Sequence, residues 1–284
     1  MKNCLPLFSG NTIEVDPQNS RIKIYQLPNK DIDKTIKYFK LMGLEKKCNK
    51  IIFYLKENEI NLFSGYDLRH EGIIKGFFQG KNAYIYSMFL DPPLIIDPAI
   101  SAKEEKVMEI IKSYNLKFEL PVPKEYVVRT AKEKDAPKMA QLYDTVFKSY
   151  PTPMNDPQYI VLMMNNYAYY TIVEHNHKII SACAATVLPL FNCAEMTDCA
   201  TLPEYRRQGL LSYQYSQLIK KMKSKGLQTL FCYSRSVSIG MNLVNIKHGF
   251  IYGGCLIQNS NISEQFEKTQ TGNYANMNIW YKQI

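Results

Sequence analysis

One segment of this chain, DCATLPEYRRQGLLSYQYSQLIKKM over residues 198–222, carries the residues best suited to bind a charged ligand. It predicts a strand, a basic loop with Gly209, and an amphipathic helix. Apolar residues recur at the spacing of one helix face, at Leu211, Tyr215, Leu218, Ile219 and Met222. Unpaired N–H groups and the helix dipole make such a helix start attractive to anions, and Arg206 and Arg207 add charge. The segment therefore predicts a site for a pyrophosphate, although such a turn can also be purely structural.

The composition is typical of a soluble globular protein. The chain has 284 residues, 46% hydrophobic and 21% charged, which suits two domains that each bury a core. No apolar run reaches the length of a membrane span, and the first residues lack a secretory signal, so we expect a cytoplasmic protein with no membrane partner. The 7 cysteines include no Cys-x-x-Cys pair, which favours reduced thiols over disulfides or a zinc site.

The formal net charge of +9 predicts an anionic partner, either nucleic acid, a membrane surface or a phosphorylated cofactor. The basic residues are scattered and form no nucleic-acid-binding motif, so we expect no nucleic-acid partner. The 4 histidines show no metal-ligand spacing, and we predict no metal site.

Two prolines in LPVPKEYVV mark the predicted boundary between an N-terminal domain, residues 1–122, and a C-terminal domain, residues 123–284. The N-terminal domain is predicted to be a smaller α/β unit. Its expected elements are a hairpin over 12–25, a helix over 32–43, the strand KIIFYL, two β-rich runs around Gly80 and a helix over 101–114.

The C-terminal domain shows alternating helix and strand signals. Cap residues and helical spacing predict helices after Asp135 and Asp156, and Ser238 begins a helix that ends at Gly249. Strands are predicted over 126–129, 169–174, 178–188 and 191–202, and at QTLFCYS, which we expect to lie parallel to the strand before it.

The loop and the element order resemble those of the GNAT acyl-CoA N-acyltransferases. The signature of that family is Arg/Gln-x-x-Gly-x-Gly/Ala after a strand, and Arg206 and Gly209 match it. Leu211 replaces the last small residue, and Arg207 stands where glycine is common. The order β, α, α, β, β, β, α, β, α, β, β over 124–284 matches the GNAT fold, an α/β fold with a mixed central sheet flanked by helices.

Four segments, AEMTDCATLPEYRRQGL, GFIYGGCLIQNSNI, MNIWYK and EGIIKGFFQG, resemble more narrowly the β-lysine N-acetyltransferases. This resemblance covers nearly the whole chain. It implies that acetyl-CoA is the co-substrate and that the side-chain amine of β-lysine, a small diamino acid, attacks the thioester directly. The product is then Nε-acetyl-β-lysine, a compatible solute. The N-terminal domain would bind the substrate or form the interface of a homodimer.

The resemblance also implies which residues hold acetyl-CoA. The backbone at the end of a splayed strand would bind the pantetheine arm, at Ala200, Thr201 and Leu202. The loop would bind the pyrophosphate, at Arg206, Arg207, Gln208, Gly209, Leu210 and Leu211. Ser238 takes the place of an asparagine that often contacts the cofactor.

Acetyl transfer also needs a group that removes a proton from the amine, because an alkylammonium has a pKa near 10.4. Glu195 is the first candidate, since its place before the strand end resembles that of a catalytic glutamate in some GNAT enzymes; an ordinary strand carboxylate is the alternative. Asp198, predicted on the opposite face of the strand, suits a cationic substrate, as does Glu71 in EGIIKGFF.

The position of the general acid departs from the family pattern. GNAT enzymes often place a tyrosine there, near the end of the last helix, whereas this chain has Asn245. Either Tyr233 or another nearby tyrosine substitutes as the acid, or the thiolate leaves without one, which its reference pKa of about 8.5 permits.

Two further functions stay open at this point. One is the same chemistry on another amine, such as lysine, ornithine, a polyamine or a protein lysine. The other is a non-catalytic acyl-CoA-binding module, which the missing tyrosine and the missing small loop residue favour.

Overall fold

The computed structural model describes most of the chain. The described residues are 12–28, 31–93, 98–114, 125–265 and 274–284. The predicted domain boundary near residue 123 lies outside them.

The first part of the chain is α/β, as the sequence predicts. Its strands are β1 (Ile13–Asp16), β2 (Arg21–Ile24), β3 (Lys50–Leu55), β4 (Arg69–Phe78) and β5 (Lys81–Phe89), and its helices are α1 (Ile32–Lys46) and α2 (Pro98–Ser113). The hairpin of β1 and β2 and the pairing of β4 with β5 around Gly80 are confirmed. Helix α1 runs past the predicted end at Gly43 and closes at Lys47, whose left-handed φ of 57° caps it.

The second part contains the predicted alternation of helices and strands. Its helices are α3 (Ala136–Val146), α4 (Pro157–Asn165), α5 (Leu210–Ser224) and α6 (Ile239–Lys247). Its main strands are β6 (Val127–Thr130), β8 (Ala168–His175), β9 (Lys178–Leu188), β10 (Cys193–Thr201), β11 (Thr229–Arg235), β12 (Ile251–Ser260) and β14 (Ala275–Gln283). A separate short pair joins β7 (Phe147–Ser149) and β13 (Ser263–Glu264).

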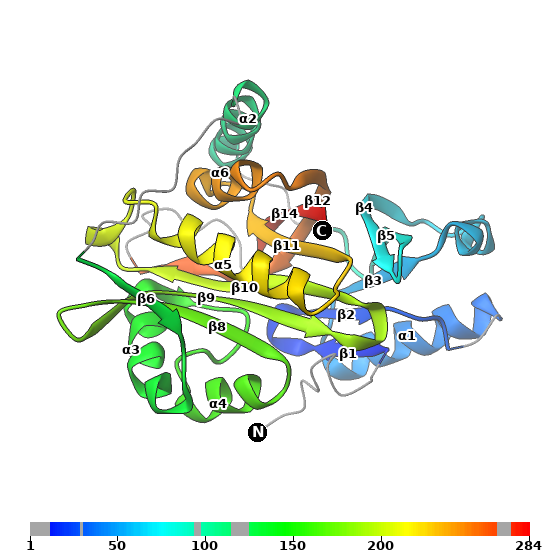
Figure 1. The fold of residues 1–284 in the computed structure, drawn as a ribbon. Coiled ribbons are helices and arrows are strands. Elements are labelled where there is room, and N and C mark those ends of the chain that lie inside the picture. Colours follow the sequence, from blue (N-terminus) through cyan, green and yellow to red (C-terminus); the bar gives the residue numbers. More distant parts are fainter. Residues whose placement is uncertain (1–11, 29–30, 94–97, 115–124, 266–273) are drawn as a thin grey trace.

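The main strands of both parts form one 12-stranded sheet in the order β1-β2-β3-β5-β4-β12-β14-β11-β10-β9-β8-β6 (Figure 1). The two predicted domains meet where β4 pairs with β12, at Gly72 and Gly254. A Cβ atom on Gly72 would lie 2.3 Å from the Gly253 carbonyl oxygen, and one on Gly254 would lie 2.2 Å from that of Glu71. Only glycine permits this approach, so the sheet continues from one part of the chain to the other.

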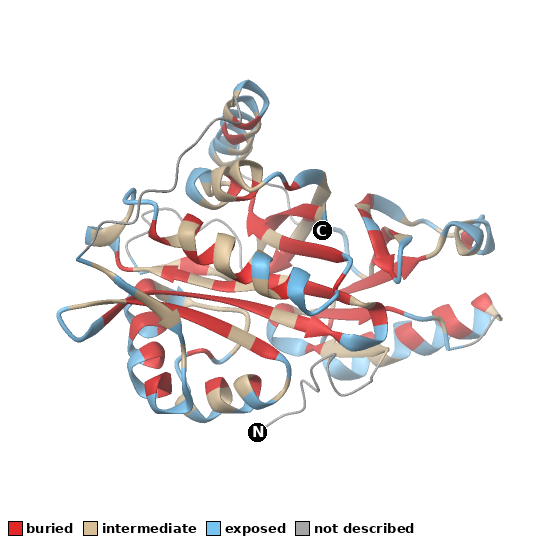
Figure 2. Cartoon of the chain, viewed as in Figure 1, coloured by how far each residue is buried: buried red, intermediate tan, exposed pale blue. Residues whose placement is uncertain are grey.

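Alternation along β9 separates two helical layers. Ala182 and Ala184 belong to the core beneath α3 and α4, whereas Cys183 and Ala185 belong to the core beneath α5. This strand is buried along almost its whole length in Figure 2. A strand covered on both faces has apolar residues at consecutive positions, which explains the run KIISACAATVL.

The parallel strands β10 and β11 pair over three residues and then separate. Their register joins Cys193–Glu195 to Thr229–Phe231. Strand β10 meanwhile stays paired with β9, although the register shifts between Thr197 and Ala200. The separation leaves the edge of β10 open toward β11, and the functional cavity lies there.

Candidate active site

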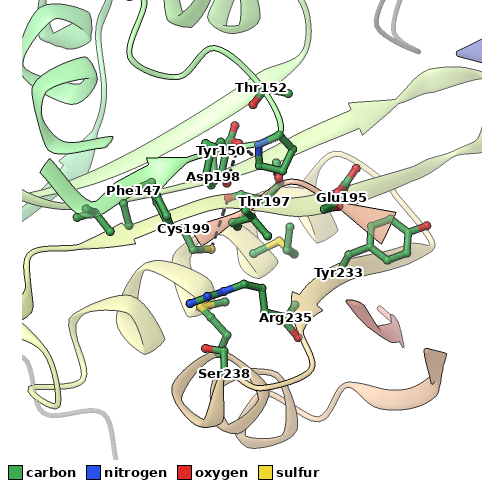
Figure 3. A pocket seen from close by; sticks show the side chains of 18 of the residues that line it. Phe147, Tyr150, Thr152, Glu195, Thr197, Asp198, Cys199, Tyr233, Arg235 and Ser238 are labelled. Atoms are coloured by element: carbon green, nitrogen blue, oxygen red, sulfur yellow. Dashed lines mark hydrogen bonds between the residues drawn. The ribbon is translucent and has the colours of Figure 1, made fainter. Parts of the chain in front are cut away.

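A cavity of about 1160 Å³ extends along the separated strands. One end, called here the loop end, is formed by the loop over 206–211 and the starts of α5 and α6. The opposite end, the hairpin end, receives charged side chains of β1 and β2. Figure 3 shows Glu195 and Asp198 on β10 and, across the space from them, Tyr233 and Arg235 on β11 and Ser238 at the start of α6.

The loop before α5 has the backbone shape that an anion site requires. Gly209 has φ 76° and immediately precedes α5, and Arg207 has φ 66°. Arg207 therefore adopts the left-handed conformation for which glycine is common at this position. Leu210 and Leu211 lie in the first turn of the helix, where N–H groups have no partner within the helix. All of the predicted loop residues line the cavity.

Arg206 is held by the protein itself. Its Nε atom donates to the Thr201 carbonyl oxygen at 3.2 Å, and its guanidinium pairs with Glu264 at 2.9 Å. Glu264 also pairs with Arg235 at 2.7 Å. Sequence alone predicted a phosphate contact or a solvated side chain, whereas the structure shows a brace that ties the loop to the end of β10.

The predicted pantetheine strand has its second edge open. Ala200 O accepts from Ser181 Oγ at 3.0 Å, and Leu202 N donates to Ile180 O at 2.9 Å, so these bonds all run toward β9. The last β10–β11 pair joins Glu195 to Phe231. Beyond it, the edge of β10 that faces the cavity has no strand partner, and although the Thr201 carbonyl oxygen there accepts from Arg206, this edge can still pair with an extended amide-containing ligand.

Glu195 points its carboxylate into the cavity and is half-buried. Among the described residues we find no hydrogen-bond donor to it. Burial raises the pKa of Glu195 to about 7, with Lys23 lowering it and Glu14 and Asp198 raising it. A carboxylate that titrates near neutral pH can accept a proton from an amine.

Asp198 lines the same cavity, although strict alternation predicted that it would lie on the face opposite Glu195. The register shift, at which Asp198 adopts φ 51°, breaks that alternation. Its carboxylate accepts from Tyr170 at 2.9 Å and from Tyr150 at 3.3 Å. Burial raises the pKa of Asp198 to about 6, opposed by the hydroxyl hydrogen bonds.

Tyr233 lines the cavity, and its hydroxyl lies 2.6 Å from that of Tyr54. Burial raises the pKa of Tyr233 well above its usual value, so its proton stays bound at neutral pH. Asn245 is buried elsewhere, where its side-chain oxygen accepts from Tyr215 at 3.3 Å and from Cys232 at 3.1 Å. The family's usual acid position is therefore part of the packing here.

Glu71 does not line the cavity. Its carboxylate forms a buried ion pair with Lys50 at 2.8 Å and accepts from Ser87 Oγ and the Ile257 N–H. Burial lowers the pKa of Lys50 to about 8 despite this partner. The structure thus does not bring Glu71 to the other site residues, because the carboxylate already neutralises an internal lysine.

Several residues that line the cavity were not predicted from the sequence. They are Glu14, Asp16, Arg21 and Lys23 from the hairpin, Tyr150 and Arg235. Local sequence gives only one signal for the first four, the alternation of charged and apolar residues in IEVD and RIKI. That pattern predicts a two-faced hairpin and says nothing of which distant strand it meets.

Within the described part of the chain, no cluster of His, Cys, Asp and Glu side chains could hold a metal ion. The 6 described cysteines are all free thiols. None of the described helices is both long and apolar enough to cross a membrane.

Comparisons with known proteins agree with this geometry. A family model described as Acetyltransferase (GNAT) family matches residues 136–241. The beta-lysine N(6)-acetyltransferase of Methanococcus maripaludis is 33% identical, with 97% of each chain covered. The N-acetyltransferase YodP of Bacillus subtilis is 33% identical over 97% of this chain and 98% of its own. A beta-lysine N(6)-acetyltransferase of Methanosarcina mazei is 28% identical over 86% and 94%, respectively.

The full-length similarity, the splayed strands and the anion loop together classify this protein. The chain is an N-acetyltransferase of the GNAT family, and within it belongs to the family that contains these β-lysine N(6)-acetyltransferases.

Proposed function

We propose that this protein transfers the acetyl group of acetyl-CoA to the side-chain amine of β-lysine and so makes Nε-acetyl-β-lysine, a compatible solute. The observation that carries the chemistry is the Glu195 carboxylate, which faces the cavity beside the open edge of β10 and has a pKa of about 7. The names of the relatives support the substrate.

The loop end fits acetyl-CoA. The helix start at Leu210 and the left-handed turns at Arg207 and Gly209 suit the pyrophosphate, and Arg206 braces this loop against the end of β10. The open edge at Ala200–Leu202 suits the amides of the pantetheine arm. Ser238, at the start of α6, supplies a hydroxyl to the same end of the cavity.

Glu195 takes a proton from the ammonium, directly or through a water molecule, and the free amine attacks the thioester carbonyl carbon. The C–N bond forms, the nitrogen of the tetrahedral species loses its second proton to water, and the species collapses as the C–S bond breaks to release the CoA thiolate. Tyr233 holds its proton at neutral pH and is the candidate donor to that thiolate. Asp198 adds negative charge that favours a cationic substrate.

The test is acetyl-CoA-dependent thiol release by the purified protein with β-lysine, α-lysine, ornithine and spermidine, followed by mass spectrometry of the products. We expect a strong preference for β-lysine and one acetyl group on its side-chain nitrogen. Release with a different amine would keep the chemistry and discard the substrate. Binding of acetyl-CoA without release would indicate a non-catalytic binding module.

A further inference from the structure

The β1–β2 hairpin brings two ion pairs to the hairpin end of the cavity. Its register places Glu14 opposite Lys23 and Asp16 opposite Arg21, and all four side chains line the cavity. Buried charged side chains need hydrogen-bond partners. The partners of these four side chains therefore show which pair is fully used within the protein and which pair can also bind a ligand.

The Arg21–Asp16 pair is fully hydrogen-bonded within the protein. Asp16 accepts from Arg21 Nε at 3.0 Å and from the side chain of Asn19 at 2.7 Å. A guanidinium nitrogen of Arg21 also donates to Asn259 O at 2.7 Å and to Ser260 Oγ at 3.0 Å. This pair fastens the hairpin to β12 and has little capacity for a ligand.

The Lys23–Glu14 pair is different. Lys23 Nζ donates to the two Glu14 oxygens at 3.1 and 3.3 Å, and the remaining contact of this carboxylate is Tyr25 Oη at 3.2 Å. Among the described residues, Glu14 is the one hydrogen-bond partner we find for the Lys23 ammonium. Both side chains are largely buried, at 10% and 16% exposed, so their charges face the cavity more than open solvent.

The pair also lies near the proposed base. Among its charged neighbours, Lys23 and Glu14 have the largest effects on the pKa of Glu195: Lys23 lowers this pKa and Glu14 raises it. A ligand that engages this pair can therefore present another of its groups to Glu195.

We propose that the Lys23–Glu14 pair recognises the amino-acid head of the acceptor, with the substrate carboxylate on Lys23 and the neighbouring ammonium on Glu14. This inference rests on the proposed function and deepens it. The acceptor class is a diamino acid with a free carboxylate, whose distal amine extends to Glu195. Each of the four charges then meets an opposite one, in the way that complementary potentials select a partner.

A diamine without the carboxylate would bring only cations to this end. The diamine could pair with Glu14. The Lys23 ammonium would then lose its counter-charge and would lie beside a second cation. An unpaired charge in a buried site strongly disfavours the wrong ligand, so the pair excludes polyamines.

The test compares β-lysine with pentane-1,4-diamine, which is β-lysine with hydrogen in place of the carboxyl group. Lys23→Met is the test variant, and Lys75→Met, on an exposed part of β4 away from the cavity, is its matched control. We expect the wild type and the control to prefer β-lysine. Lys23→Met should raise KM for β-lysine by about 10–100-fold, as for a lost charge-assisted bond, and leave the diamine unaffected or improved.

A charge swap separates recognition from folding. Glu14→Lys combined with Lys23→Glu keeps an ion pair in the hairpin but exchanges its ends. If the pair only supports the fold, the swap restores the β-lysine KM and the inference fails. It also fails if Lys23→Met keeps the wild-type selectivity, or if the wild type uses the diamine as well as β-lysine.

Parallel assays with α-lysine and pentane-1,5-diamine keep the two proposals apart. A wild type that uses α-lysine instead of β-lysine overturns the proposed substrate, while the Lys23 variant still tests the pair on the new one. A wild type that acetylates neither amino acid overturns both proposals.

Discussion

The two ends of the cavity are built from different parts of the polypeptide. The loop end presents backbone groups, held in place by left-handed turns at Arg207 and Gly209. The hairpin end presents side chains from elements far apart in sequence, including Glu14, Lys23 and Glu195. A backbone site tolerates side-chain changes, which is how Arg207 and Leu211 can depart from the family signature, whereas a side-chain site depends on each residue type.

We expect the largest effect on activity at Glu195, because a site built from side chains should depend on this one residue. Glu195→Gln keeps the shape and removes the base, so we expect kcat to fall by about 10²–10⁴-fold. The KM for acetyl-CoA should change little, because the loop end is untouched. Steady-state kinetics of Glu195→Gln check this, with Glu204→Gln, an exposed residue outside the cavity, as the control variant. Unchanged turnover would exclude Glu195 as the base.

The pH profile sharpens the same point. The active form of Glu195 is deprotonated, and its pKa is about 7, so kcat/KM should fall about tenfold per pH unit below that value. Profiles of wild type and Glu195→Gln over pH 5–9 test this; the residual activity of the variant should lack this step. A wild-type profile that stays flat down to pH 5, as for a glutamate with the ordinary pKa of about 4.3, would contradict the buried environment described here.

At the loop end, backbone shape should matter more than side chains. Gly209 has φ 76° and Gly226 has φ 77°, and a Cβ atom on either would meet no atom within 4 Å. Alanine should therefore destabilise both positions alike, by about 1–2 kcal/mol of left-handed strain. Only Gly209→Ala should also raise KM for acetyl-CoA, by about tenfold if that strain is relieved by distorting the loop. Equal KM values in the two variants would show that the turn at Gly209 does not hold the cofactor.

The smallest effect is expected at Arg207, an exposed residue in the same loop. Arg207→Gly removes a charge but relieves left-handed strain, so we expect Tm to rise by about 2–4 °C for about 1 kcal/mol. The KM for acetyl-CoA should rise less than in Gly209→Ala. Arg207→Ala, which loses the charge and keeps the strain, separates the two contributions in thermal melts and kinetics. If an Arg207 variant lost more affinity for acetyl-CoA than Gly209→Ala, side chains would matter more than backbone shape at the loop end, contrary to the contrast between the two ends of the cavity.

The parts of this protein that local sequence could predict are those that local forces determine. Helix α5 follows from the apolar spacing after Gly209, and the parallel arrangement of β10 and β11 follows from the helix that connects them. The loop end combines these two elements, and the loop residues predicted to bind the cofactor all line one cavity.

The hairpin end could not be predicted in the same way, because contacts between distant segments create it. The same limit applies to Glu71 outside the cavity, whose partner is Lys50, on a strand whose sequence KIIFYL gives no indication of a buried charge. The shift at Asp198 departs from strict alternation without a glycine to mark it. Glu14 and Lys23 reach the cavity because β4 pairs with β12 and because Arg21 fastens the hairpin to β12.

Strand β14 gives this arrangement a consequence for synthesis. It follows every other described strand in the chain, yet it lies inside the sheet between β12 and β11. Without Ala275–Gln283 the strand order divides into two sets, β1 to β12 and β11 to β6, and each set has an unpaired inner edge. Such edges pair readily with other chains, so nascent or truncated chains that end before Ala275 should aggregate, and completing the sheet is a late folding step.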